Sequence, residues 1–282
     1  MRPSLEAIYQ WTIETFRSDP RIVAAWEYGS SGKGTEDEHS DVDPVFVVDD
    51  EHYASVHDEL RPMFEKLSSR IVMFWPEGFN SADIANYAII FEPRDHPGEL
   101  LQYDMTVASA SSVRSGFGKA LLTRCGGVQV LFDKKGLLRD VQNAAPAERY
   151  APAKLLWDIE RYWVYVYIHV KYLKRGDTFK LLYAQQTLRE IHLGVLRALH
   201  PDAYWGWWAW SAKNVLTPAE QEHILRYFGP GEATAVASAL AREIDELGAD
   251  ARKACAAWGL AYPDAVEREI TGYLRRELGR QR

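Results

Sequence analysis

The sequence has little cysteine and no long run of apolar residues. Its two cysteines, Cys125 and Cys255, exclude a framework of several disulfide bonds and a metal site built from cysteine ligands. No stretch approaches the roughly 18 consecutive apolar residues that a membrane-spanning helix needs. Residues 1–19 carry Glu6 and Glu14 among apolar positions in a helical rhythm, which is not the pattern of a signal peptide. We therefore expect a soluble cytoplasmic protein with no membrane partner.

An excess of positive charge is also missing. The chain has 33 lysine and arginine residues against 40 aspartate and glutamate residues, which gives a net charge of −7. Because a phosphate backbone is bound by a basic surface, we expect no nucleic acid partner. A nucleotide held through metal ions is compatible with this charge, and an acidic surface also attracts cationic molecules.

The hydrophobic pattern changes near the middle of the 282 residues. Compact apolar runs interleave with helical spacing in the first half, which predicts an α+β domain over residues 1–145, a mixed sheet flanked by helices. From residue 146 to 282, apolar residues recur in steps of three and four, which predicts an α-helical bundle. The boundary falls in residues 141–153, which contain two prolines and several alanines. We expect strands at 21–28, 42–48, 71–75, 87–91, 100–107 and 128–132, and helices at 5–16, 51–67, 112–122, 156–173, 179–199, 218–228, 232–247 and 264–278.

Two aspartates, two residues apart, follow a glycine-rich loop. Gly29 ends the first expected strand, the loop runs through Lys33, and Asp41 and Asp43 open the next strand. Side chains two apart on a strand point to the same face, so the two carboxylates lie side by side. Mg²⁺ typically takes one or two protein carboxylates and completes its coordination with water and substrate phosphates. The spacing therefore predicts a magnesium site beside the loop.

A third aspartate, Asp104, stands inside an otherwise apolar expected strand. Because an unpaired buried carboxylate is costly, it requires a metal ion, a cation or a proton. Sites with two metal ions, roughly 3.5–4 Å apart, stabilise the attacking and the leaving oxygens of an in-line displacement. Taken alone, Asp104 is also compatible with a salt bridge or an exposed sheet edge.

The order of these features, a strand, Gly-Ser, a glycine loop, Asp-x-Asp and a later aspartate, resembles the signature of the polymerase-β-like nucleotidyltransferase superfamily. In particular, it is similar to bacterial aminoglycoside and lincosamide nucleotidyltransferases and their uncharacterised relatives. The resemblance implies a nucleotide, bound through two Mg²⁺ ions, and a catalytic domain followed by a helical domain. It assigns nucleotide binding to Gly29, Ser30 and Lys33, metal binding to Asp41 and Asp43, and to Asp104 either a place in the metal site or the role of proton acceptor.

The reaction that this resemblance implies is transfer of a nucleoside monophosphate, AMP from ATP, to a hydroxyl of a small molecule such as an aminoglycoside-like antibiotic, with release of pyrophosphate. One residue departs from the pattern. Pro44 directly follows the aspartate pair, where relatives usually carry an apolar residue with an N–H group, and this predicts a sheet edge or a bulge. The departure leaves open a nucleotide-binding regulatory or antitoxin-like protein, or a protein AMP-transferase, with little small-molecule turnover.

Other motifs in the chain fit less well. A phosphate-binding loop requires a glycine five residues before the Gly32-Lys33 pair, where this chain has Glu27, and a serine or threonine after Lys33, where it has Gly34. An RNA-cleaving toxin of the fused kind would show an arginine followed by four to six residues and a histidine, and no arginine here has that spacing. The tryptophans of residues 205–210 suit either stacking on a flat ligand or packing between helices.

Overall fold

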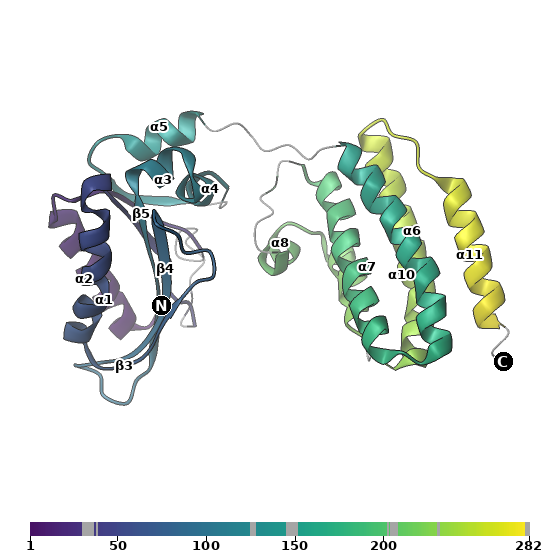
Figure 1. The fold of residues 1–282 in the computed structure, drawn as a ribbon, viewed down its shortest axis with the longest axis horizontal. Coiled ribbons are helices and arrows are strands. Elements are labelled where there is room, and N and C mark those ends of the chain that lie inside the picture. Colours follow the sequence, from purple (N-terminus) through teal and green to yellow (C-terminus); the bar gives the residue numbers. More distant parts are fainter. Residues whose placement is uncertain are drawn as a thin grey trace. The chain divides into compact units, whose positions relative to one another are not determined.

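The computed structural model describes residues 1–29, 37, 39–124, 128–144, 152–201, 203, 208–229 and 232–279. The chain divides into two compact units, Met1–Pro146 and Ala147–Arg282, and each has an apolar core of its own (Figure 1). No helix in the described part of the chain combines the length and the apolar character that a membrane crossing requires.

The first unit is built on a mixed sheet, which within the described residues has six strands in the order β3-β4-β5-β2-β1-β6. The two central strands β2 and β5 run parallel, and every other neighbouring pair is antiparallel. The predicted α+β fold with a mixed sheet is thus confirmed. The strands are β1 Ile22–Glu27, β2 Pro44–Val48, β3 Ser68–Pro76, β4 Ile84–Pro93, β5 Leu101–Ser109 and β6 Gln129–Asp133.

Helices cover both faces of this sheet because the strand side chains alternate. Phe46 packs on one face with the helices α1 and α2, whereas Val45 and Val47 pack on the other with α3, α4 and α5. Figure 1 shows the first pair of helices lying together along the sheet. The bounds are α1 Pro3–Ser18, α2 Tyr53–Leu67, α3 Ala110–Ser115, α4 Phe117–Arg124 and α5 Leu137–Ala144, with a short 3-10 turn, η2 Asp50–His52, before α2.

Three features of the first unit differ from the sequence prediction, and the first is the helix α5, where no helix was expected. The single helix expected at 112–122 is divided at Gly116, whose N–H closes the first helix on the carbonyl of Ser112 at 2.8 Å. Pro44 is at neither an edge nor a bulge, so that prediction was wrong. It is the first residue of a central strand, opposite Glu27 of β1 in a register that runs unbroken to Val47. A proline is tolerated there because the first residue of a strand can lack a ladder donor.

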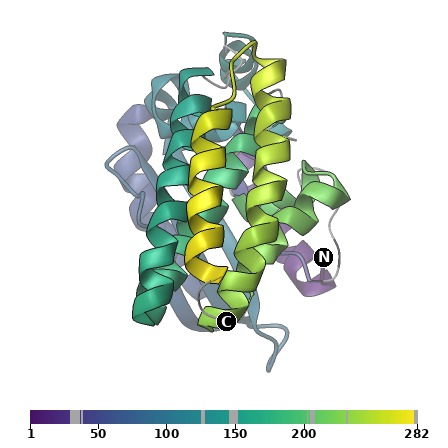
Figure 2. The ribbon, with the colours of Figure 1, turned by 90° about the vertical axis from the view of Figure 1, so that its right-hand side faces the viewer.

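The second unit is helical, as predicted, and its long helices run alongside one another (Figure 2). The buried face of its first helix repeats in steps of three and four through Ile159, Trp163, Val166 and Val170, which are all fully buried. Side chains cap two of the later helices: Asp177 accepts from the backbone N–H of Lys180, and Thr217 and Glu220 form a capping box. The elements are α6 Pro152–Arg175, α7 Thr178–Leu199, α8 Trp208–Asn214, α9 Pro218–Leu225, η3 Arg226–Phe228, α10 Ala233–Ala257 and α11 Asp264–Gly279.

Candidate active site

The backbone pairing of the sheet brings two of the predicted aspartates next to each other. In the parallel ladder between β2 and β5, Val45 lies opposite Thr106. The pairing continues before the start of β2, because the N–H of Asp104 donates to the carbonyl of Val42 at 3.0 Å. Two residues back along both strands, Asp43 therefore stands beside Asp104.

Asp43 and Asp104 also share one face of the sheet, and Asp41 lies near both. Asp41 and Asp43 precede β2, which begins at Pro44 and not at 42 as expected. Val42 is fully buried in the core beneath α1 and α2, so Asp43 is directed to the opposite face, and Asp41 lies within electrostatic range of both Asp43 and Asp104. On β5 the flanking Tyr103 and Met105 belong to that same core, which directs Asp104 away from it as well. All three aspartates are partly buried. The structure thus collects the three carboxylates that the sequence singles out.

The electrostatics of Asp43 reflect this crowding. Burial, followed by the negative charges of Asp41, Asp104 and Glu27, raises the pKa of Asp43 to about 8. No cation of the described residues is among the groups that set this pKa. Like charges at one site disfavour ionisation, and a divalent cation would reverse that preference. The cluster therefore has the charge and the hard oxygen donors that suit Mg²⁺.

The pKa of Asp104 is raised less than that of Asp43. Burial raises the pKa of its carboxyl to about 6, aided by Asp41 and Glu77 and opposed by a hydrogen bond from Gln102. The Gln102 amide Nε2 lies 3.2 Å from both Asp104 oxygens, because residues two apart on β5 share a face. A carboxylate held in this way, with a pKa near neutrality, suits either a metal ligand or a proton acceptor.

Gly29 is the one predicted nucleotide-binding residue that the structure describes, and it packs against the aspartate cluster. Its φ of +79° lies in the left-handed region that favours glycine. A Cβ atom at this position would lie 2.2 Å from Asp43 Oδ2, far inside van der Waals contact. Glycine is thus required here for its backbone conformation and for the space that Asp43 occupies. Ser30 and Lys33, the other two predicted nucleotide-binding residues, lie outside the described residues.

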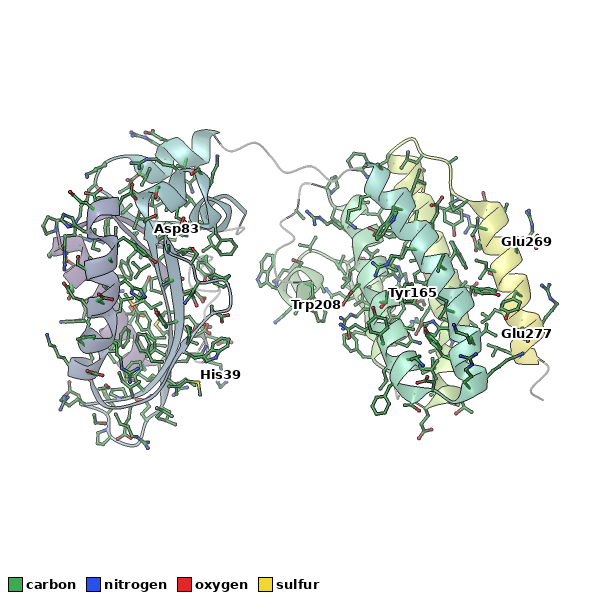
Figure 3. All side chains as sticks on the ribbon, viewed as in Figure 1. His39, Asp83, Tyr165, Trp208, Glu269 and Glu277 are labelled. Atoms are coloured by element: carbon green, nitrogen blue, oxygen red, sulfur yellow. The ribbon has the colours of Figure 1, made fainter. Side chains whose placement is uncertain are left out.

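The described end of the glycine loop is held by its own polar groups. The backbone N–H of His39 donates to Asp37 Oδ1 at 2.9 Å, and the N–H of Asp37 donates to Ser40 Oγ at 3.0 Å. His39 is labelled in Figure 3. These contacts make Asp37 part of the local turn that precedes Asp41.

Sequence reasoning missed Glu27, the last residue of β1. Its carboxylate is 1% exposed, accepts a hydrogen bond from the hydroxyl of Tyr9 on α1, and lies 3.5 Å from the N–H of Asp43. It therefore supports the backbone of the cluster from the α1 side of the sheet. An acidic residue inside an apolar strand was the available signal, the same signal that marks Asp104.

In the helical unit, Trp208 of the tryptophan motif is among the described residues, and it contacts side chains of the same unit. The ring of Trp208, which Figure 3 labels, stacks on Phe228 with centroids 6.1 Å apart. The guanidinium of Arg189 lies 4.6 Å from the centroid of the Trp208 ring. Trp205 and Trp207 lie outside the described residues. Because Trp208 is 41% and Phe228 53% exposed, this contact is compatible with both interpretations of the motif.

Comparisons with known proteins give similarities at low sequence identity. No protein-family model matches the chain, and no curated protein matches it. The chain is similar in structure to an aminoglycoside 6-adenyltransferase from Bacillus subtilis, with 15% identity, a TM-score of 0.44 and coverage of 99% of each chain. It is also similar to a nucleotidyltransferase-like protein from Exiguobacterium sibiricum, with 9% identity, a TM-score of 0.32 and coverage of 89% of this chain and 77% of that one.

Proposed function

We propose that the protein is a metal-dependent nucleotidyltransferase that moves a nucleoside monophosphate, AMP from ATP, onto a hydroxyl of a small molecule and releases pyrophosphate. The observation that supports this is the convergence of Asp41, Asp43 and Asp104 beside Gly29. The first unit would be the catalytic domain. The acceptor would be a small hydroxylated molecule such as an aminoglycoside-like antibiotic.

Asp41 and Asp43 would hold Mg²⁺, with Asp104 completing the site or accepting the proton from the attacking hydroxyl. Bound metal would neutralise the phosphates and the charge that develops during the displacement. The protein contributes position: the carboxylates are fixed by the sheet, Gln102 orients Asp104, and Gly29 allows the loop backbone to approach the carboxylates. Positioning and electrostatic stabilisation are the main sources of rate enhancement in phosphoryl-group chemistry.

The test is pyrophosphate release from ATP with Mg²⁺ and a panel of hydroxylated antibiotics. Asp41→Asn and Asp43→Asn should each abolish release, and Asp49→Asn, at the other end of β2, should retain it. If no acceptor gives pyrophosphate while ATP binds tightly, transfer to small molecules is refuted and a regulatory nucleotide-binding role is favoured. AMP found on protein in the same mixtures would instead indicate a protein AMP-transferase.

Asp104→Asn separates the two roles of Asp104. If Asp104 is the proton acceptor, the variant should bind Mn²⁺ with ATP about as tightly as the wild type and lose turnover by a factor of roughly 10²–10⁴. If Asp104 is a metal ligand, Mn²⁺ binding itself should weaken. Calorimetric titration beside the pyrophosphate assay gives both numbers on the same preparation.

A further inference from the structure

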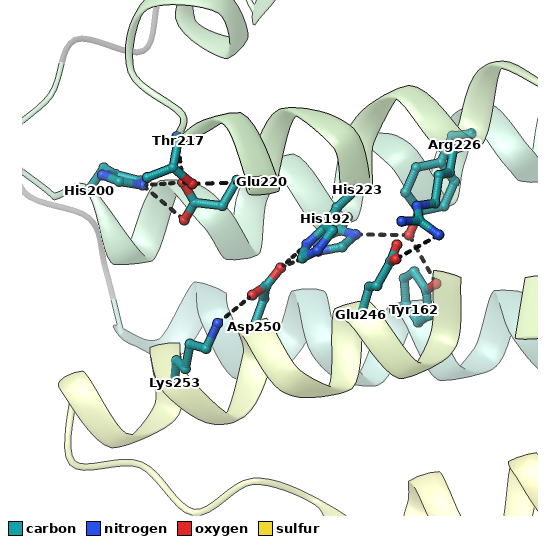
Figure 4. Close-up of polar contacts among 11 residues, drawn as sticks. Tyr162, His192, His200, Thr217, Glu220, His223, Arg226, Glu246, Asp250 and Lys253 are labelled. Carbon is teal, nitrogen blue, oxygen red and sulfur yellow. Dashed lines mark hydrogen bonds and ion pairs between the residues drawn. The ribbon is translucent and has the colours of Figure 1, made fainter. Parts of the chain in front are cut away.

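Away from the sheet, two imidazoles and one carboxylate of the helical unit converge on one point. His192 lies on α7, His223 on α9 and Asp250 on α10 (Figure 4). The ligand atoms of the three side chains all lie within 4.8 Å of one another. His192 Nε2 is 3.2 Å and His223 Nδ1 is 2.8 Å from the same oxygen, Asp250 Oδ2.

Two of the three separations, those from the histidine nitrogens to Asp250 Oδ2, are close to those of a tetrahedral metal site. With bonds of about 2.0–2.1 Å, two ligand atoms on a tetrahedron around zinc lie roughly 3.3 Å apart. The pair formed by His192 and Asp250 already has this separation, and the pair formed by His223 and Asp250 needs to open by roughly half an ångström. Imidazole nitrogen combined with carboxylate oxygen suits zinc, whereas magnesium prefers oxygen ligands alone.

Burial and hydrogen bonding orient the group. The side chain of His192 is 0% exposed, that of Asp250 is 1% exposed, and that of His223 is 20% exposed. The other ring nitrogen of His192, Nδ1, lies 2.9 Å from the hydroxyl of Tyr227, which is 3.1 Å from the hydroxyl of Tyr162. Metal-bound histidines usually donate their second ring N–H to such an outer partner. A tyrosine hydroxyl accepts as well as donates, so this contact allows the tautomer of His192 that leaves Nε2 unprotonated.

The charges around the group are compatible with a divalent cation. Lys253 Nζ lies 3.2 Å from Asp250 Oδ1, the oxygen that does not face the histidines, and so leaves Oδ2 to a metal. Glu246 lies within electrostatic range of His223 and Asp250, and its carboxylate is paired with Arg226 at 3.0 Å.

We propose that His192, His223 and Asp250 bind one Zn²⁺ ion that joins α7, α9 and α10. Three protein ligands leave the fourth position to water, which reaches the site past the partly exposed His223. In the metal-free protein the imidazoles donate N–H groups to Asp250. When zinc binds neutral imidazoles, each proton moves to the other nitrogen of its ring, so no proton is released. The proposal does not depend on the nucleotidyltransferase activity, because all its residues belong to the helical unit.

The test is metal binding by the full-length protein without an affinity tag, after treatment with EDTA. Zinc is titrated calorimetrically, and Co²⁺ is used as a spectroscopic probe because four-coordinate cobalt with nitrogen ligands absorbs far more strongly in visible light than six-coordinate cobalt with oxygen ligands. Asp43→Asn is titrated in parallel, since the carboxylate cluster of the first unit also attracts divalent ions. We expect one zinc site that this variant retains, with micromolar affinity or tighter, and a rise in the unfolding midpoint of the helical unit of about 8–9 °C at zinc concentrations about 100 times the dissociation constant.

The decisive variant is His223→Gln, because His223 is partly exposed and its replacement disturbs the core least. It should weaken zinc binding at least about 100-fold and remove the visible cobalt bands. His200→Gln is the matched control: His200 also contacts a carboxylate, that of Glu220 at 3.1 Å, and this variant should bind zinc as the wild type does.

The proposal is overturned if His223→Gln binds zinc as tightly as the wild type. It is also overturned if the wild type shows no cobalt band and is not stabilised by about 100 µM zinc. The three side chains would then form only a hydrogen-bonded network. Should His223→Gln fail to fold, nitrogen NMR of the wild-type imidazoles decides: zinc must shift Nε2 of His192 and Nδ1 of His223, and unshifted signals refute the site.

Discussion

Replacing Asp43 with asparagine should stabilise the metal-free protein while removing its metal site. The ordinary pKa of an aspartate is 3.8, and in the folded protein burial and three neighbouring carboxylates raise the pKa of Asp43 to about 8. Between these two values the unfolded chain is ionised and the folded chain holds a proton. A raised folded pKa means that the free energy of unfolding falls as pH rises through this window, by up to about 1.4 kcal/mol per pH unit.

The full interval would amount to roughly 5–6 kcal/mol, which is an upper bound. Because Asp43 is only partly buried, water screens part of the repulsion, and we expect a difference of about 1–3 kcal/mol at pH 8.5. For a unit of this size, that difference raises the unfolding midpoint of Asp43→Asn by about 3–9 °C over the wild type. At pH 4 the two proteins should have nearly equal midpoints, since the wild-type carboxyl is then protonated in the folded state and about 40% protonated in the unfolded state, so that little of the difference has developed.

Thermal unfolding in EDTA at several values between pH 4 and 8.5 measures this directly, and Asp95→Asn, at an exposed turn, is the control that should show no such trend. Added Mn²⁺ should then stabilise the wild type and leave Asp43→Asn unchanged. A variant that is no more stable than the wild type at pH 8.5, or a difference that is the same at pH 4 and pH 8.5, would refute the proposed repulsion among the carboxylates.

Three further predictions concern the same cluster. Mn²⁺ affinity should rise with pH up to about 8, because Asp104, with a pKa of about 6, and then Asp43, with a pKa of about 8, bind metal only after losing their protons. Calorimetry across this range tests it, and a flat profile would contradict it. Gly29→Ala should weaken Mn²⁺ binding and lower the free energy of unfolding by about 1–3 kcal/mol, because alanine disfavours the positive φ and its Cβ would lie 2.2 Å from Asp43 Oδ2. Chemical unfolding measures this loss. A variant that is as stable as the wild type and binds Mn²⁺ equally well would contradict the prediction. Glu27→Gln should weaken Mn²⁺ binding at pH 7 about two- to threefold, because a negative charge near the cluster attracts a divalent cation more strongly than it attracts the proton of Asp43. Tyr9→Phe is the control that keeps the charge, and unchanged or tighter Mn²⁺ binding in Glu27→Gln would contradict this prediction.

The sequence predicts those features of the candidate site that depend on residues close together in the chain, and it does not predict those that depend on pairing between distant segments. The period of two along a strand is a local property, so the proximity of Asp41 and Asp43 could be predicted from their spacing. That Asp104 stands next to Asp43 depends on the parallel pairing of β2 with β5, which no local pattern specifies. The position of Glu27 depends in the same way on the packing of α1 against β1, seen in its hydrogen bond to Tyr9.

The helices likewise differ in how far the sequence predicts them. Steps of three and four along α6 predicted its buried face, because that face covers a continuous stripe in contact with the core. The short α8 was not predicted, since seven residues are too few to establish a period. The cluster of His192, His223 and Asp250 was also not predicted, because its members come from three helices and have no common spacing.

The parallel pairing of β2 with β5 has a consequence for how the protein is made. Asp43 and Asp104 are separated by about sixty residues of sequence, and a whole helix and two strands intervene between their strands. A growing chain that has emerged only as far as β4 carries the aspartate pair but not its partner strand, and contacts between such distant segments form late in folding. Metal binding by nascent or truncated chains would therefore report the completion of the sheet, and a ribosome-bound series of increasing length should acquire it only once β5 has emerged.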